Sequence, residues 1–286
     1  MMNHTAETKI IKGEDYYLEV YLDYFNERIR VDNYRGNMTS IVQKINELAE
    51  PDKFSKIIFY CRQDHWRKLL PLGFELEAII DGYFNGTDNY ILTYYKKVNR
   101  RESSTWIEED QIINRIITNQ KSTDKVTDPP CQYHFRKAIS EDAENLAKLY
   151  KHVFAIYPTP MNDPQYIKKM ICNGTIFYVV EAKNEIVSAA SAEKNVIFHN
   201  AELTDCATLA EHRKYGLMKK LLIFLEGDLK NEGIYHVYSI ARAQSYGMNA
   251  VFYQLNYKYN GRLTNNCYIF NQLENMNVWV KDLSLK

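Results

Sequence analysis

The chain has 286 residues, which is enough for two modest domains or one large one. Its 36 Lys and Arg residues balance its 36 Asp and Glu residues, so no net field is expected to attract nucleic acid or a membrane surface. We therefore expect the partner to be a small molecule.

The five cysteines are scattered along the chain and form no CxxC pair. This pattern argues against a disulfide framework and against zinc, and the histidines show no ligand spacing, so no metal site is expected. The first residues contain no apolar signal core, and no run reaches membrane-spanning length. We expect a soluble, cytoplasmic protein with no membrane partner, and a homodimer is compatible with the sequence.

The first 98 residues predict a small mixed α/β unit. Alternating apolar and polar residues predict two strands within Tyr17–Tyr34, and an amphipathic pattern predicts a helix over Asn37–Glu50. The other predicted elements of this unit are a strand at Lys56–Cys61, a helix at Gln63–Leu72, and strands at Phe74–Asp81 and Tyr90–Lys96.

The clearest change of composition lies between Val98 and Gln132. It contains a charged segment, an amphipathic stretch at Trp106–Thr118 that predicts a short helix, and a polar run ending in Pro129-Pro130. We interpret residues 99–131 as a linker with one helix. A flap over a functional site is the alternative.

Residues 132–286 predict a second mixed α/β domain with the order β-α-α-β-β-β-α-β-α-β-β. The predicted elements before its central strand are a strand at Gln132–Ile139, helices at Ser140–Ile156 and Asp163–Gly174, and a hairpin of Thr175–Ala182 with Glu185–Glu193. Those after it are a helix ending near Leu229, a strand at Ile234–Ile240, a helix at Ser245–Leu255 and two final strands.

The segment Ala201–Leu229 carries the most informative pattern. An alternating strand enters a strongly helical run through the charged turn Glu211–Gly216. Such a turn places free backbone N–H groups and the positive end of the helix dipole at one point, which suits a phosphate or pyrophosphate. Arg213 and Lys214 add positive charge, and Gly216 permits close approach of a ligand. An ordinary β-α connection without a ligand is the alternative.

The run Arg213-Lys214-Tyr215-Gly216-Leu217-Met218 resembles the acetyl-CoA loop of the GNAT superfamily of N-acetyltransferases, usually Arg/Gln-x-x-Gly-x-Gly/Ala. Met218 stands where a small residue is usual, which suggests a tighter or slightly shifted pyrophosphate cradle. From Tyr133 onward the chain more closely resembles the β-lysine N-acetyltransferases, which act on the product of lysine 2,3-aminomutase. That closer match is carried by Ala201–Thr208, Ala241–Ala243, Gly247–Asn249, Asn260–Asn266 and Glu274–Trp279.

The resemblance implies a GNAT acyl-CoA N-acyltransferase fold, a mixed central sheet flanked by helices, for residues 132–286, with acetyl-CoA as the cofactor. It implies that a backbone N–H near Leu209 or Ala210 meets the oxyanion. Ser245 stands in place of a common Asn near the cofactor arm, and Asn249 could compensate for that change.

The first unit repeats the latter half of this plan, with Tyr34–Met38 at the position of the loop. We interpret residues 1–98 as a degenerate GNAT-like half domain that packs against the catalytic domain. We expect it to bind no acetyl-CoA of its own.

Acetyl transfer to an amine requires a base, because a lysine-type ammonium has a pKa of about 10.4. Asp205 and Glu202 on the strand before the loop are the candidates, since a charge in such a strand is costly unless it is paired or faces a cleft. A structural salt bridge is the alternative for Asp205. Glu193 is a candidate substrate ligand or a solvated side chain. Strand alternation predicts that Asp205 points away from Glu202.

The proton donor to the leaving thiolate is usually a Tyr on the last helix of these enzymes. Phe252 takes that position, so its neighbour Tyr253 is the candidate, with a merely packed tyrosine as the alternative. Arg242, just past the Ile234 strand, could bind a substrate carboxylate or form a surface ion pair. The residues expected to form another wall of the substrate site are Arg262, Asn265 and Asn266.

Together these features predict an acetyl-CoA-dependent N-acetyltransferase that acts on the terminal amine of β-lysine or a related small amino acid by direct transfer. A diamine or polyamine acetyltransferase is one alternative. A non-catalytic acyl-CoA-binding protein, suggested by Met218 and Phe252, is the other.

Overall fold

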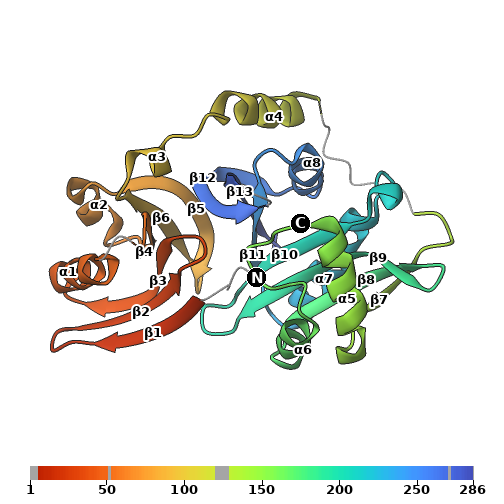
Figure 1. Cartoon of the computed structure of the whole chain (residues 1–286), viewed down its shortest axis with the longest axis horizontal. Helices are drawn as coiled ribbons and strands as arrows, with labels where there is room; N and C mark the ends of the chain where they lie inside the picture. The colour runs from red at the N-terminus through yellow and green to blue at the C-terminus, as the bar shows by residue number, and fades with distance from the viewer. Residues whose placement is uncertain (1–5, 51–52, 120–128, 270–271, 286) are drawn as a thin grey trace.

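The computed structural model describes residues 6–50, 53–119, 129–269 and 272–285. Its strands form one continuous mixed sheet in the order β1-β2-β3-β4-β6-β5-β12-β13-β11-β10-β9-β8-β7. The N-terminal strands lie on one side of the molecule and β7–β11 on the other, with β12 and β13 between them (Figure 1). Residues 120–128 of the expected linker lie outside the described residues.

The N-terminal half contains six strands and two α-helices among its described residues. They are β1 (Ala6–Lys12), β2 (Tyr16–Asp23), β3 (Arg28–Gly36), α1 (Met38–Ala49), β4 (Lys56–Arg62), α2 (Trp66–Leu69), β5 (Glu75–Phe84) and β6 (Thr87–Tyr95). The pattern missed β1, which lies exposed along the edge of the sheet. The helix expected to reach Leu72 is one α-turn followed by a 3₁₀ turn, because Pro71 has no N–H to continue the α-helix.

Two helices follow, and the C-terminal half then begins at β7. The helices are α3 (Val98–Arg101) and α4 (Trp106–Asn119). The elements of the C-terminal half up to the central strand are β7 (His134–Lys137), α5 (Ala143–Val153), α6 (Pro164–Cys172), β8 (Ile176–Ala182), β9 (Glu185–Asn195) and β10 (Asn200–Thr208). The remaining ones are α7 (Leu217–Asn231), β11 (His236–Arg242), α8 (Tyr246–Gln254), β12 (Lys258–Ile269) and β13 (Gln272–Asp282).

The two halves repeat one strand order, β2-β3-β4-β6-β5 in the first and β9-β10-β11-β13-β12 in the second. Each half contains one parallel pair, β3 with β4 or β10 with β11, connected by a helix. The halves join where Gly261 of β12 lies opposite Ala78 of β5. Gly261 has φ +134°, and a Cβ there would lie 2.3 Å from the carbonyl oxygen of Glu77. Only glycine permits this close approach of the two strands.

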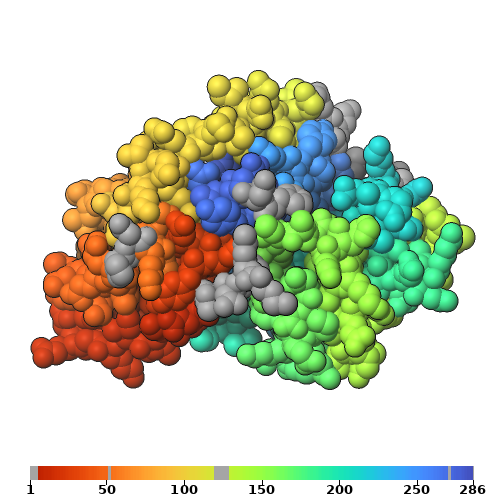
Figure 2. Space-filling model, viewed as in Figure 1, coloured from red at the N-terminus to blue at the C-terminus, as the bar shows by residue number. Residues whose placement is uncertain are grey.

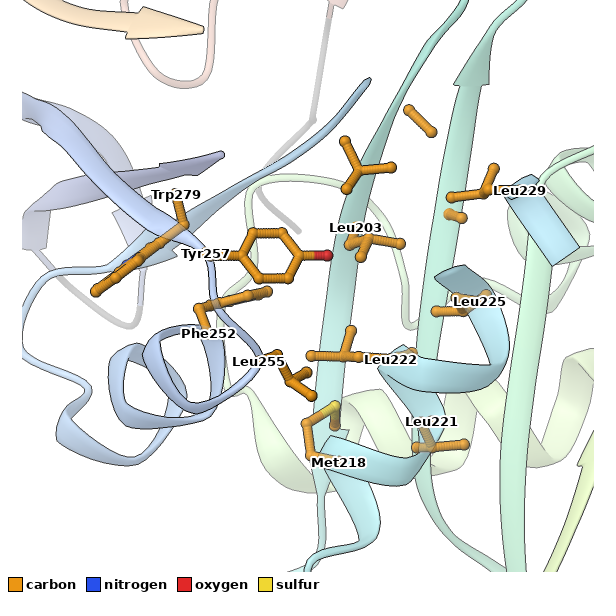
Figure 3. Packing of buried hydrophobic residues seen from close by; sticks show 14 of the residues in the cluster. Leu203, Met218, Leu221, Leu222, Leu225, Leu229, Phe252, Leu255, Tyr257 and Trp279 are labelled. Carbon is orange, nitrogen blue, oxygen red and sulfur yellow. The ribbon is translucent and has the colours of Figure 1, made fainter. Parts of the chain in front are cut away.

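Helices cover one face of the sheet in the first half and parts of both faces in the second, where α5 and α6 pack opposite α7. In the first half, apolar residues of β3 and β4 pack on Ile41 and Ile45 of α1. In the second, the leucines of α7 pack on Leu203 and, with Phe252 and Trp279, form the core shown in Figure 3. Met218 is 8% exposed and joins this core. Its large side chain therefore fills core volume.

The opposite faces of the two half-sheets meet each other. Ile58 and Tyr60 of β4 share one buried cluster with Tyr238 of β11 and with Val278 and Val280 of β13. The N-terminal half therefore packs against the sheet face of the C-terminal half that α7 leaves uncovered.

The helix α4 is fastened to the C-terminal strands. Arg262 of β12 contacts the Asp110 carboxylate at 2.8 Å, and the Asn275 amide donates to Glu109 at 2.7 Å. In Figure 2 the yellow segment that contains α3 and α4 runs along the molecule from the orange N-terminal part past the blue C-terminal strands. In the ranges that the structure describes, no helix combines the length and apolar character of a membrane span.

Candidate active site

A cavity of about 720 Å³ is lined by residues from both halves of the molecule. Its walls come from the first turns of α7 and α8, from β10 and β11, from the loop after α5, and from β3, β4 and β12. The cavity is the place where the two half-sheets and the helix termini come together.

The passage through the cavity exists because β10 and β11 separate. The two strands pair at Asn200, Ala201 and Glu202, and the ladder between them ends at Glu202. Beyond that point Thr204 of β10 and Ser239 of β11 both line the cavity. The gap connects the side of the sheet covered by α7 with the side that faces the N-terminal half.

A bulge in β10 brings Asp205 to the substrate side of this gap. Asp205 has φ +50°, and the ladder with β9 shifts register between Thr204 and Ala207. The Ser191 hydroxyl donates to the Asp205 carboxylate at 2.6 Å, and Ser191 lies opposite Thr204, so these side chains share a face. The prediction that Asp205 points away from Glu202 is wrong, because the bulge interrupts the alternation.

Three carboxylates therefore gather at one end of the cavity. Glu193 and Glu202 lie opposite each other in the ladder, and Asp205 lies beside them. Burial raises the pKa of Glu202 to about 7, with Asp205 adding to the shift and Arg30 opposing it. Burial raises the pKa of Asp205 to about 6 against the Ser191 hydrogen bond.

Glu193 is the most accessible of the three carboxylates. Removal of water by the surrounding protein still raises the pKa of Glu193 above its ordinary value, and the charges of Asp205 and Glu202 raise it further. A cationic ligand at this end would relieve the repulsion among the three groups. The cluster therefore favours an amine.

The other end of the cavity lies at the N-terminus of α7. Gly216 precedes the helix with φ +73°, and no side chain caps the first turn. Arg213, Lys214 and Leu217 line the cavity at this point. The arrangement presents backbone donors and the positive end of the helix dipole to an anion.

The corresponding helix of the N-terminal half is arranged differently. The Asn37 side chain caps α1 by accepting from the Thr39 N–H at 2.9 Å. The Asp15 carboxylate accepts from the Ser40 hydroxyl at 2.9 Å. A side-chain cap and a carboxylate make this terminus a poor site for a second anion.

Comparison with known proteins agrees with this geometry. Residues 143–257 match the model of the Acetyltransferase (GNAT) family. The chain is 40% identical to N-acetyltransferase YodP of Bacillus subtilis (strain 168) over 261 residues, which are 91% of this chain and 94% of that protein. The chain belongs to the GNAT acetyltransferase family. It is an N-acetyltransferase, and enzymes of this family use acetyl-CoA. The predicted family, fold class and cofactor are confirmed.

Two further comparisons add detail. The chain is 33% identical to Beta-lysine N(6)-acetyltransferase of Methanosarcina mazei over 270 residues, covering 88% of this chain and 100% of that protein. Among solved structures, N-acetyltransferase from Staphylococcus aureus Mu50 superposes with a TM-score of 0.47 at 19% identity, over 53% of this chain and 98% of that one.

Most of the residues expected in the GNAT cradle line the cavity. They are Arg213, Lys214, Gly216, Leu217, Met218 and Ser245. Tyr215, Leu209, Ala210 and Asn249 are not among the lining residues. The Leu209 N–H donates to the Val187 carbonyl at 3.0 Å and is not available to an oxyanion. Asn249 is fully buried. Its Nδ2 donates to the Arg242 carbonyl, and its Oδ1 accepts a hydrogen bond from the Trp279 indole N–H.

The tyrosine expected as proton donor lies outside the cavity. The Tyr253 hydroxyl is 3.4 Å from the Ile117 carbonyl of α4, whereas the buried Phe252 lines the cavity. The placement of Tyr253 favours the alternative of a packing residue, because successive residues of α8 point in different directions.

The expected substrate residues divide into two groups. Glu193, Asn266 and Arg242 line the cavity. Nε and Nη2 of Arg242 both donate to the Glu274 carboxylate at 2.6 Å, and Glu274 is buried, so Arg242 forms a bidentate structural pair. Arg262 and Asn265 do not line the cavity. Arg262 contacts α4, and the Asn265 amide donates to the Glu102 carbonyl at 2.7 Å, which fastens the linker to β12.

Two cavity residues that the sequence did not suggest are Arg28 and Arg30 of β3. They alternate with Ile29 and Val31, which are buried beneath α1. This alternation was a sequence signal of a charged strand face. Only the packing of the two halves shows that the face lies in the active site.

The free thiols of the described chain include Cys206, which lines the cavity. Burial raises the pKa of Cys206 above its ordinary value, so it is held as a neutral thiol. Among the residues described, no group of His, Cys, Asp and Glu side chains is arranged to hold a metal ion.

Proposed function

We propose that this enzyme acetylates the terminal amine of β-lysine or a related small amino acid, by direct transfer from acetyl-CoA with both substrates bound together. The carrying observation is one continuous cavity that connects the uncapped N-terminus of α7 with three carboxylates. Relatives from Methanosarcina mazei and Methanococcus maripaludis, at 33% and 30% identity, are named as β-lysine N(6)-acetyltransferases, which supports the choice of substrate.

Asp205 is the candidate base in this proposal. The reacting ammonium must lose a proton before attack, and Asp205 lies at the gap between β10 and β11. Its pKa of about 6 leaves it ionised at neutral pH. Glu202 and Glu193 would hold the remaining positive charge of the substrate.

The backbone at the bulge is the candidate donor to the thioester carbonyl. Acetyl-CoA supplies the acetyl group in activated thioester form. A bulge leaves an extra residue outside the ladder, and the Asp205-Cys206 segment lines the cavity where the strands separate. The proton that the nitrogen loses on becoming an amide balances the proton that the thiol gains. The overall proton balance of the transfer step therefore requires no side-chain acid, in agreement with Phe252 at the usual tyrosine position.

A coupled acetyl-CoA assay over β-lysine, lysine, ornithine and spermidine tests the proposal. We expect the highest kcat/KM for β-lysine, with NMR of the product placing the acetyl group on the terminal nitrogen. Acetyl-CoA binding without acetylation of any amine in the panel would show a non-catalytic acyl-CoA-binding protein instead.

Asp205→Asn tests the proposed base. We expect a fall in kcat of roughly 100-fold or more, with the Kd for acetyl-CoA unchanged, because the cradle lies at the other end of the cavity. A variant with nearly full kcat would remove Asp205 from the mechanism without affecting the choice of substrate.

A diamine or polyamine acetyltransferase is the second candidate. The observation that favours it is the cluster of three carboxylates, which suits a ligand with several ammonium groups. Spermidine turned over faster than β-lysine in the same assay would select this function.

We also propose that the chain divides into a half domain at 1–98, a linker at 99–131 and the catalytic domain at 132–286. The half domain is expected to bind no acetyl-CoA, so calorimetric titration should give one site per chain. Two sites of equal affinity would overturn this. The homodimer remains a prediction, which sedimentation of the purified protein would check.

A further inference from the structure

The cavity wall contributed by the N-terminal half carries two arginines. Arg28 and Arg30 lie on β3, outside the 143–257 segment that matches the family model, and both line the cavity. They line the same cavity as the three carboxylates, and the charge of Arg30 opposes the pKa shifts of both Glu202 and Glu193. The cavity therefore offers both signs of charge at its substrate end.

The Arg30 guanidinium is held in a fixed orientation. It lies over the rings of Tyr21 and Tyr60, at 5.2 and 5.3 Å from their centroids. Nε and Nη2 both donate to the Asp32 carboxylate. Within the described part of the chain, no group accepts a hydrogen bond from Nη1, and 32% of the side-chain surface is accessible. One edge of a planar fork is thus fixed by the protein and the other is open to a ligand.

Arg28 and Asn266 complete this wall. Nε of Arg28 donates to Asp23 at 2.9 Å and Nη1 donates to the Asn266 carbonyl at 3.1 Å. The side-chain Oδ1 of Asn266 is buried and has no hydrogen-bond partner among the described residues. Asn266 is 5% exposed and lines the cavity. Asn266 therefore contributes a polar part of the wall beside Arg28.

We propose that Arg30, with Arg28 beside it, forms the subsite that binds the substrate carboxylate. The inference rests on the proposed function, since it describes how an amino acid rather than a simple diamine occupies the same site. In this proposal the N-terminal half binds the carboxylate end of the substrate, and the C-terminal half performs the acetyl transfer.

This assignment differs from the one that the sequence suggested. Arg242 was the expected carboxylate ligand, but two of its nitrogens bind the buried Glu274 carboxylate. Arg30 also has a carboxylate partner, yet Asp32 does not line the cavity, so a ligand can reach the open edge of the guanidinium without displacing it.

The test compares β-lysine with its carboxamide, which keeps both amines and loses only the negative charge. For the wild-type full-length enzyme we expect kcat/KM for the acid to exceed that for the amide by roughly 10- to 100-fold, as for one charge-assisted hydrogen-bonded pair. In Arg30→Gln the ratio should fall to about one through a higher KM for the acid, with turnover of the amide changed by less than about threefold.

Arg35→Gln is the matched control. Arg35 lies on the same strand, is exposed and does not line the cavity, so the same loss of charge should leave the acid-to-amide ratio at the wild-type value. Arg30→Lys should give an intermediate ratio, because an ammonium keeps the charge without the planar fork.

The outcomes separate the inference from the function on which it rests. An unchanged ratio in Arg30→Gln, or equal losses for acid and amide with acetyl-CoA Kd intact, would overturn the carboxylate subsite while β-lysine remains the substrate. No turnover of β-lysine by the wild type would instead overturn the proposed function. If Arg30→Gln does not fold, the acid-to-amide ratio of kcat/KM is measured in Arg28→Gln instead. The wild-type ratio also tests the inference, because an enzyme with equal kcat/KM for acid and amide has no carboxylate subsite.

Discussion

Asp205 lies in the left-handed region of backbone conformation, inside a bulge of β10. A residue other than glycine in this region costs free energy, and hydrogen bonds from neighbouring side chains hold it there. The Tyr150 hydroxyl donates to its carbonyl at 2.8 Å, and the Ser191 hydroxyl donates to its carboxylate at 2.6 Å. The same hydroxyl lowers the pKa of Asp205 against the effect of burial. Ser191 is therefore a positioning residue for the proposed base.

Ser191→Ala should move the acid limb of the kcat/KM profile to higher pH. Loss of a hydrogen bond to a charged acceptor corresponds to about one pKa unit, so the midpoint near pH 6 should rise to near 7. Ser188→Ala is the control, because that hydroxyl donates to the Ala207 carbonyl on the same pair of strands. A uniform fall in rate at every pH, without displacement of the limb, would contradict the positioning role.

Glu202 links protonation to folding. Its pKa of about 7 in the folded protein lies above the ordinary carboxyl value, so the folded state binds the proton more tightly than the unfolded state. This contribution to stability is present below about pH 4 and is lost as pH rises through 7. With allowance for water in the cavity, we expect Glu202→Gln to raise the melting temperature at pH 8.5 by about 2–4 °C.

The check is the melting temperature of wild type and Glu202→Gln measured from pH 5 to pH 8.5. The difference between the two curves should be largest at pH 8.5 and should shrink steadily toward pH 5, because the folded wild-type carboxyl becomes protonated as the pH falls through 7. A constant difference across the range would mean that the variant acts through packing alone.

At the scale of elements, α7 combines two tasks that the sequence pattern made visible. Its leucine spacing specifies the buried face, and the glycine before its first residue specifies the turn. Met218 was the weakest match to the acetyl-CoA loop, and Figure 3 shows it among the core side chains near Leu222 and Leu255. Core packing thus accounts for a large side chain at this position.

Gly216→Ala should weaken acetyl-CoA binding and leave amine binding intact. Alanine at φ +73° is strained by about 1 kcal/mol, and relief of that strain rotates the first N–H groups of α7 away from the anion. We expect the KM for acetyl-CoA to rise about tenfold with the KM for the amine unchanged.

Gly227→Ala in the same helix is the matched control. Its added Cβ would meet no atom within 4 Å, so helix propensity alone should act, stabilising the protein by up to about 1 kcal/mol. Its KM for acetyl-CoA should stay at the wild-type value. An equal effect of both substitutions on acetyl-CoA binding would show that the position of the glycine does not matter.

Periodicity predicted nearly all the helices and strands of the C-terminal half, because their apolar faces follow regular spacing. The bulge at Asp205 escaped the prediction, since a register shift depends on the partner strand β9. Polar residues were the harder case. Arg262 and Asn265 have the chemistry of substrate ligands but fasten the segment of α3 and α4 to β12, whereas nothing in the sequence singled out Arg28 and Arg30. Only the contact between the halves distinguishes them.

At the scale of the whole molecule, one sheet crosses from one half to the other at β5 and β12. Among the described residues, β5 and β12 are paired at Gly261 and Ala78 alone, whereas the ladders within each half are long. The hydrogen bonds of Asn260 to the Ile79 carbonyl and to Asp81 support this junction, at 3.2 and 3.0 Å. The position of β3 over the cavity therefore depends on this short ladder together with the buried cluster that the two half-sheets share.

Gly261→Ala should loosen this connection. The added Cβ would lie 2.3 Å from the Glu77 carbonyl, so the strands must separate, at a cost of about 1–3 kcal/mol. We expect a lower melting temperature and a KM for the amine raised several-fold, with the Kd for acetyl-CoA unchanged because α7 belongs to the other half.

Gly86→Ala is the control for backbone strain alone. It has φ +94°, but its Cβ would meet nothing within 4 Å. This variant should lower the melting temperature modestly and leave the KM for the amine unchanged. A raised KM for the amine in both variants would trace the effect to general destabilisation.

The repeated strand order has one more consequence. Arg30 faces Ile58 at the third pair of the β3–β4 ladder, and Glu202 faces Tyr238 at the third pair of the β10–β11 ladder. Equivalent positions of a duplicated architecture thus carry opposite charges on the two sides of one cavity. In this arrangement a zwitterionic substrate would meet a positive residue from one half and a negative residue from the equivalent position of the other half. Substitution of Arg30 would then change which group the substrate must carry in place of the carboxylate, while β10 with the proposed base stays unchanged.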